Sequence, residues 1–177
     1  MSGLSVLFDL LGGRSFTSLW YWLGLAAIWS MVTRNALGIP GDVVLRARRG
    51  EDWRALHDWL RLVLPHWRIG PGAGAVLVAL CCFVLTALAV LGFRHQMEAA
   101  QALFLLLAPL AVLLVLRMRL ARGLARLMAD APGPEAVRIA ATRIVRHGWV
   151  GMVLSLLAIA AASMAGAVWI ARHPFGY

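Results

Sequence analysis

Residues 73–93 read AGAVLVALCCFVLTALAVLGF and residues 97–116 read MEAAQALFLLLAPLAVLLVL, and these two apolar runs decide the fold. The first run has no charge over 21 residues, and the second has only Glu98, in its first turn. As helices, each would be roughly 30 Å long, the thickness of the hydrocarbon core of a bilayer. Only Arg94, His95 and Gln96 separate the runs. The sequence therefore predicts two antiparallel membrane-spanning helices.

The composition of the whole chain is that of a membrane protein. Of its 177 residues, 62% are hydrophobic and 14% are charged, whereas soluble domains have about 45–50% and 25%. The apolar runs do not alternate with a period of two, so they predict helices and not the strands of a barrel. All 17 basic residues are arginine, which with the abundant Ala, Leu and Gly is typical of a GC-rich bacterial genome. We expect an all-α, polytopic integral membrane protein.

Two further runs are long enough to span, at about residues 16–34 and 148–171. With the central pair, at 73–93 and 97–116, they predict four transmembrane helices in a single domain over residues 1–177. Tryptophan is common where helices cross the headgroup region. The tryptophans expected at the membrane interface are Trp20, Trp22, Trp29, Trp53, Trp67, Trp149 and Trp169.

The distribution of arginine predicts the orientation. Segments 33–72 and 117–147 hold 14 of the 17 arginines. They lie on the same side of a four-span protein, and loops rich in arginine stay in the cytoplasm. We therefore expect loops 35–72 and 117–147 to be cytoplasmic, and both termini to be periplasmic, in a multi-pass protein of the bacterial inner membrane.

Both loops contain basic amphipathic stretches. One apolar helical face is predicted in the first loop, and a helix of this kind is expected to lie flat on the membrane surface. Its members are Trp53, Leu56, Leu60, Val63, Leu64 and Trp67. Anionic lipid headgroups are the expected partners of the arginines, and nucleic acid is not an expected partner. The arginines assigned to headgroups are Arg46, Arg48, Arg49, Arg119, Arg122 and Arg126.

The last run has a stripe of small residues on one helical face, which allows another helix to approach closely. The stripe can serve packing within the chain or packing against another membrane protein, and the sequence favours neither. Its members are Gly151, Ser155, Ala158, Ala162 and Gly166.

Residues capable of chemistry are few. Glu98 is a possible functional carboxylate, although the first turn of a helix also stabilises an anion without any further role. No histidine falls in mid-membrane, where haem ligands of a helix bundle would project. A metal shared by His95, Glu98 and His173 lacks a ligand motif, and the adjacent Cys81 and Cys82 lack metal-binding spacing. We predict no cofactor, no metal and no enzymatic activity.

Several stretches have a familiar pattern: RSF at 14–16, LWYW at 19–22, LGIP at 37–40, RARR at 46–49, FVLTALAVLGF at 83–93 and EAAQALFLLLAP at 98–109. Together with Asp42 and Val44, they resemble a family of small alphaproteobacterial inner-membrane proteins described as a component of the Suf iron–sulfur assembly complex. The resemblance covers roughly residues 10–120. It implies an inner-membrane location and an association with iron–sulfur assembly.

The leading functional hypothesis is a non-catalytic accessory or assembly subunit of a larger inner-membrane complex, of the energy-transducing kind, with other integral membrane proteins as partners. One alternative is a redox or quinone-linked membrane protein that uses the outer histidines and Glu98. Another is a membrane component associated with Suf. A small transporter or channel is a third class of hypothesis; it requires polar groups along a path, and these spans offer few.

Overall fold

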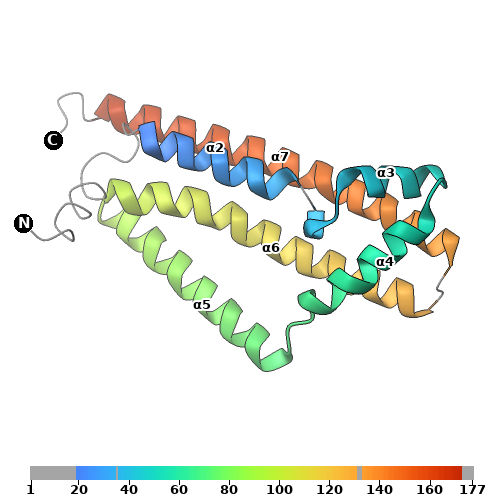
Figure 1. Ribbon diagram of the computed structural model, residues 1–177. Helices are drawn as coiled ribbons and strands as arrows, with labels where there is room; N and C mark the ends of the chain where they lie inside the picture. Colours follow the sequence, from blue (N-terminus) through green and yellow to red (C-terminus); the bar gives the residue numbers. More distant parts are fainter. Residues whose placement is uncertain (1–18, 35, 131–132, 173–177) are drawn as a thin grey trace, which may run out of the picture. The chain divides into compact units, whose positions relative to one another are not determined.

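The computed structural model describes residues 19–34, 36–130 and 133–172, and every regular element within these ranges is a helix (Figure 1). The predicted all-α class is confirmed for this part of the chain. The elements are α2 (Leu19–Arg34), η1 (Ala36–Gly38), α3 (Gly41–Arg49), α4 (Trp53–Val63), η2 (Leu64–Trp67), α5 (Pro71–Ala89), η3 (Val90–Arg94), α6 (Glu98–Asp130) and α7 (Pro134–Arg172).

Three helical stretches are long and apolar enough to cross a membrane: Gly72–Arg94, Glu98–Asp130 and Pro134–Ala171. They contain the predicted spans at 73–93, 97–116 and 148–171 almost completely. The remaining predicted span, at about 16–34, corresponds to α2, which has 16 described residues and a length of about 24 Å. Residues 16–18 lie outside the described part of the chain.

The chain divides into two compact units. Among the described residues, unit 1 comprises 19–29, 75–111 and 155–172, and unit 2 comprises 30–34, 36–74, 112–130 and 133–154. Unit 2 therefore joins the two arginine-rich loops expected from the sequence, and it contains 14 arginines and 6 acidic residues. Because α6 and α7 are continuous helices, each contributes residues to both units.

In unit 1, α5 and α6 are joined by a tight hairpin. The end of the first helix widens into the π-helix η3, and Gln96 makes the turn with a positive φ of 56°. The buried Gln101 of α6 donates its amide to the Gly92 carbonyl at 2.7 Å. A Cβ at Gly92 would lie 2.8 Å from the backbone nitrogen of Gln101. The approach of the two helices thus requires glycine at position 92.

The stripe of small residues on α7 is buried along its whole length. Its four later members lie in unit 1, and Gly151 lies in unit 2, where an added Cβ would meet Leu113 Cδ1 at 3.6 Å. Of the two uses left open by the sequence, the structure shows packing within the chain. The buried members are Gly151, Ser155, Ala158, Ala162 and Gly166.

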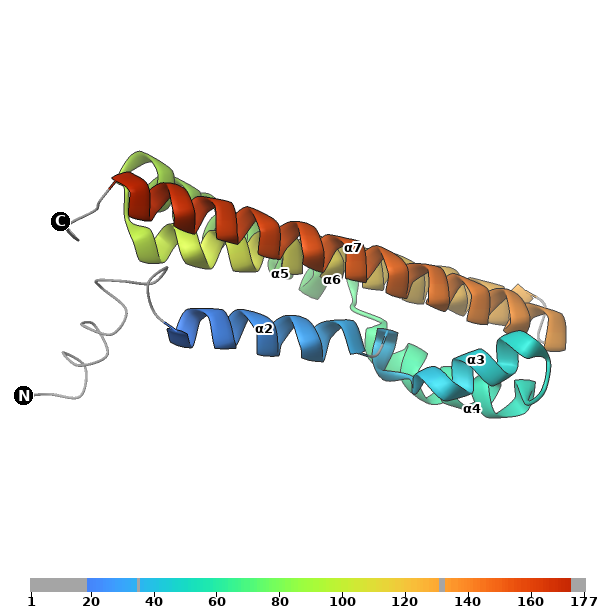
Figure 2. The ribbon, with the colours of Figure 1, turned by 90° about the horizontal axis from the view of Figure 1, so that it is seen from above.

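Local capping residues define where the short helices of unit 2 end and begin. Gly50 is the C-cap of α3; it has a positive φ of 83° and donates its backbone N–H to the Ala47 carbonyl at 3.1 Å. Asp52 then caps α4 by accepting the N–H of Ala55 at 3.3 Å. Such a glycine stop followed by an Asp cap turns the chain sharply between two helices. The two helices lie side by side in both views (Figures 1 and 2).

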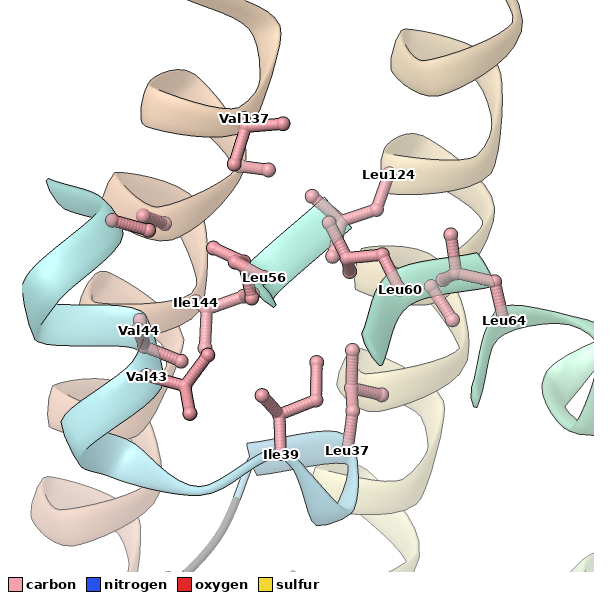
Figure 3. Close-up of a cluster of buried hydrophobic side chains, with 14 residues drawn as sticks. Leu37, Ile39, Val43, Val44, Leu56, Leu60, Leu64, Leu124, Val137 and Ile144 are labelled. Atoms are coloured by element: carbon pink, nitrogen blue, oxygen red, sulfur yellow. The ribbon is translucent and has the colours of Figure 1, made fainter. Parts of the chain in front are cut away.

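A hydrophobic core holds unit 2 together (Figure 3). Side chains from η1, α3, α4, η2, α6 and α7 point into it, and Leu56 and Leu60 of α4 are 0% exposed. Small residues such as Ala140 and Ala141 of α7 let the helices approach closely. The buried members are Leu37, Ile39, Val43, Val44, Ala47, Leu56, Leu60, Leu64, Ala121, Leu124, Val137, Ala140, Ala141 and Ile144.

The core changes the interpretation of α4. The periodicity of this helix predicts that its apolar face lies in the membrane surface. In the structure protein covers that face, with Leu56 and Leu60 fully buried and Trp53, Val63 and Trp67 packed against the same core. The reason is that α3, α6 and α7 offer complementary apolar faces within the same unit.

Candidate functional site

The most distinctive surface of unit 2 is the basic face of α7. Arg138, Thr142 and Arg146 recur every fourth residue and are exposed. At about 100° per residue, they lie within about 80° of one another, and Arg143 extends the face by about 60°. The opposite face of the same turns is buried in the core. Burial of one face therefore fixes the direction in which the arginines point.

A surface hollow of about 570 Å³ lies over this face. Helix α3 contributes Arg48 to it, and α7 contributes three further arginines. The hollow is thus lined by four guanidinium groups from two helices that pack against one core. Its lining residues are Arg48, Arg138, Ile139, Thr142, Arg143 and Arg146.

A second hollow, of about 370 Å³, lies between α6 and α7. Arg143 and Arg146 line both hollows, and Arg119 joins them in the second. A Cβ at Gly123 of α6 would lie 3.9 Å from Arg143 Nη1, an ordinary van der Waals contact, so this guanidinium lies beside the glycine. The second hollow is lined by Leu116, Arg119, Leu120, Gly123, Arg143, Arg146, His147 and Val150.

One carboxylate offsets part of the positive charge. Arg138 donates to Glu135 at 2.9 and 3.1 Å, and this hydrogen bond lowers the pKa of the Glu135 carboxyl from its usual value. Both residues are exposed and precede the apolar part of α7. Within the described ranges, Arg48, Arg143 and Arg146 form no ion pair with a carboxylate. The hollows therefore present uncompensated positive charge.

The six arginines assigned to headgroups from the sequence separate into three groups. Arg48 and Arg119 line the hollows. Arg46 forms an exposed ion pair with Asp42 at 3.2 Å. The other three are exposed but line neither hollow, namely Arg49, Arg122 and Arg126.

Arg138, Arg143 and Arg146 were not singled out from the sequence, although a basic amphipathic stretch was expected in the loop 117–147. The spacing of four between Arg138, Thr142 and Arg146 was a usable signal for one face. The contribution of Arg48 was not visible, because it depends on how α3 packs against α7.

At the edge of the second hollow, α6 is tied to the end of α2. Arg117 donates to the backbone carbonyl of Val32, and both residues belong to unit 2. His147 is half-buried beside them, and its Nε2 has no hydrogen-bond partner among the described residues. Arg117 thus satisfies a carbonyl in the last turn of α2, which would otherwise lack an intrahelical donor.

The tryptophans expected at the membrane interface occupy different environments. Trp20 and Trp149 are exposed, and Trp22 and Trp169 are half-buried. Trp29 is buried in unit 1, while Trp53 and Trp67 pack against the core of unit 2. The indoles of these last three therefore lie against protein, because neighbouring helices of the chain cover them.

Glu98 is half-buried in the first turn of α6, as the sequence indicated. In the described part of the chain, no three His, Cys, Asp or Glu side chains gather where a metal could bind. His173, considered with His95 and Glu98, lies outside that part. Cys81 and Cys82 are free thiols on α5.

Comparisons were made with protein-family models, with curated proteins and with solved structures, and none gave a match to this chain.

Proposed function

We propose that this chain is a non-catalytic accessory or assembly subunit of a larger complex in the bacterial inner membrane, of the energy-transducing kind. The observation that supports this proposal most is the exposure of α5. Only 6% of the spanning stretch in Gly72–Arg94 is buried by the chain itself, against 22% in each of the other two spanning helices. Large side chains such as Val76, Leu80 and Phe83 are exposed along it.

The exposed helix suits a partner that is itself an integral membrane protein. Helices associate in lipid through close van der Waals packing, since the lipid chains are as apolar as the side chains. The small-residue stripe of α7 is already buried by the chain. We therefore assign the contact with a second membrane protein to the exposed side chains of α5, the spanning helix that the chain itself covers least.

The proposed topology has four spans, with α2 as the first and both termini in the periplasm. Support comes from unit 2, which contains 14 of the 17 arginines. Arginine-rich segments stay on the cytoplasmic side during insertion. A folded, basic unit 2 would then face the anionic inner leaflet from the cytoplasm.

The test is to tag the protein at its native level, extract it in mild detergent and identify what remains bound by mass spectrometry. We expect a stoichiometric set of membrane subunits. Recovery of Suf proteins would identify the complex as the iron–sulfur assembly machinery. Recovery of the chain alone, with bound pigment or quinone, would instead support the redox alternative and contradict the subunit proposal.

A matched pair of variants makes the test specific to α5. Phe83 is 72% exposed on α5, and Leu156 is 61% exposed on α7. Phe83→Ala is expected to reduce recovery of the partners, whereas Leu156→Ala is expected to leave it unchanged. Equal recovery with both variants would exclude this part of α5 as the contact surface.

A further inference from the structure

We propose that the two arginine-lined hollows of unit 2 together bind the headgroup of an anionic phospholipid that has two phosphodiester groups. The proposal assumes the membrane location of the protein and does not depend on any partner subunit. Its basis is the geometry of Arg48, Arg119, Arg138, Arg143 and Arg146, which line the hollows.

The first step concerns charge. Three of the four arginines in the larger hollow form no ion pair within the described ranges, and only Arg138 is paired, with Glu135. Guanidinium groups bind phosphate oxygens through two parallel hydrogen bonds, which makes clustered arginines a strong phosphate site. Because α3 and α7, which present these arginines, share one buried core, the backbone positions of the four arginines are set before the ligand arrives.

The second step concerns the number of phosphate sites. Arg143 and Arg146 line both hollows, so two phosphate sites would lie on either side of the same pair of arginines. Arg48 and Arg138 complete one site, and Arg119 completes the other. A single lipid with two linked phosphates can occupy both, whereas a lipid with one phosphate can occupy only one.

The third step distinguishes a lipid from free phosphate. Leu116, Leu120 and Val150 line the second hollow beside its arginines. The next turn of α7 exposes further apolar side chains, Met152 and Val153. An amphiphile satisfies both kinds of lining, with phosphates on the arginines and acyl chains on the apolar side chains.

The experiment uses the purified full-length protein, stripped of lipid in a neutral detergent and titrated by native mass spectrometry. The probes are cardiolipin, which has two phosphates, dioleoyl phosphatidylglycerol, which has one, and inorganic phosphate as competitor. We expect one cardiolipin per chain, bound about tenfold more tightly than phosphatidylglycerol. The reason is that the second phosphate contacts further arginines, and each such contact adds to the binding free energy. Inorganic phosphate at millimolar concentration is expected not to displace it.

Two variants test the site. Arg143→Gln with Arg146→Gln is expected to weaken cardiolipin binding by about 10- to 30-fold. Gly123→Leu fills the second hollow without changing the charge, and it is expected to reduce the preference for cardiolipin over phosphatidylglycerol. The matched control is Arg122→Gln with Arg126→Gln, which removes the same charge from exposed positions outside both hollows and is expected to change binding by less than about threefold.

Three results would overturn the proposal. Equal losses in the two double variants would show that the lipid responds to net charge alone. Equal affinity for the two lipids would exclude paired phosphate sites. Complete displacement by inorganic phosphate would assign the hollows to the free anion and not to a lipid.

Discussion

Gly92 is the residue on which the central hairpin depends most directly. We expect Gly92→Ala to lower the free energy of unfolding by about 1–3 kcal/mol, because the added Cβ would lie 2.8 Å from a backbone atom of Gln101 that cannot rotate away. Thermal unfolding of the full-length protein in detergent, followed by circular dichroism, measures the effect. Gly24→Ala is the control, since a Cβ there meets no atom within 4 Å. Equal stability of the two variants would contradict the close approach.

Glu135 is a second residue with a testable role. Its carboxylate accepts a hydrogen bond from Arg138 at 2.9 Å. It therefore competes with a phosphate group for that guanidinium. Glu135→Gln removes the competing charge, and cardiolipin binding is expected to become about two- to fivefold tighter. The measurement is the same titration by native mass spectrometry. Weaker binding by this variant would mean that Glu135 positions Arg138 for the ligand and does not compete with it.

At the scale of the element, the testable question is whether lipid or protein covers the apolar face of α4. Leu60 is 0% exposed and Leu62 is 67% exposed on the same helix. Leu60→Ala is expected to destabilise unit 2 by about 2–5 kcal/mol because it leaves a cavity. Hydrogen exchange of the α4 amides, in detergent and without lipid, reports this change directly.

Leu62→Ala is the matched control for this prediction, and a change within about 0.5 kcal/mol is expected. If lipid and not protein covered the apolar face of α4, Leu60→Ala would leave exchange in lipid-free detergent unchanged.

Helix α4 also shows where sequence reasoning reaches its limit. Periodicity correctly grouped Leu56, Leu60 and Leu64 on one face, because helix geometry is local. Periodicity does not identify what covers a face, since lipid and protein both satisfy an apolar side chain. The missing information was the complementary face of α7, whose Val137, Ala140 and Ile144 are far away in the sequence.

The spanning helices were easier to predict for the same physical reason. The uncharged run at 73–93 predicts a membrane span without knowledge of its neighbours, because the free energy of its transfer into the bilayer is a sum over its own residues. The arginine hollows were only partly predictable. Arg48 and Arg119 stood out as members of basic runs, but their association with Arg143 and Arg146 depends on tertiary packing.

At the scale of the whole molecule, the orientation in the membrane is testable with single cysteines. In a background with Cys81→Ala and Cys82→Ala, we expect Leu19→Cys and Gln96→Cys to react with an impermeant maleimide added to the periplasmic side. Arg126→Cys is expected to react only after the inner membrane is permeabilised, because arginine-rich segments remain in the cytoplasm. If position 19 reacts like position 126, α2 does not span, and the protein crosses the membrane three times.

The core of unit 2 is built from two segments that are synthesised at different times. Its first half, up to Leu64, leaves the ribosome before its second half, which begins at Ala121. Roughly 60 residues separate them, which at about 5–20 residues per second is an interval of roughly 3 to 12 seconds. The central hairpin is synthesised within this interval. Until Ala121 and Leu124 emerge, only η1 and α3 can cover the apolar face of α4, so the core around Leu56 and Leu60 stays incomplete while α5 and the apolar part of α6 enter the membrane.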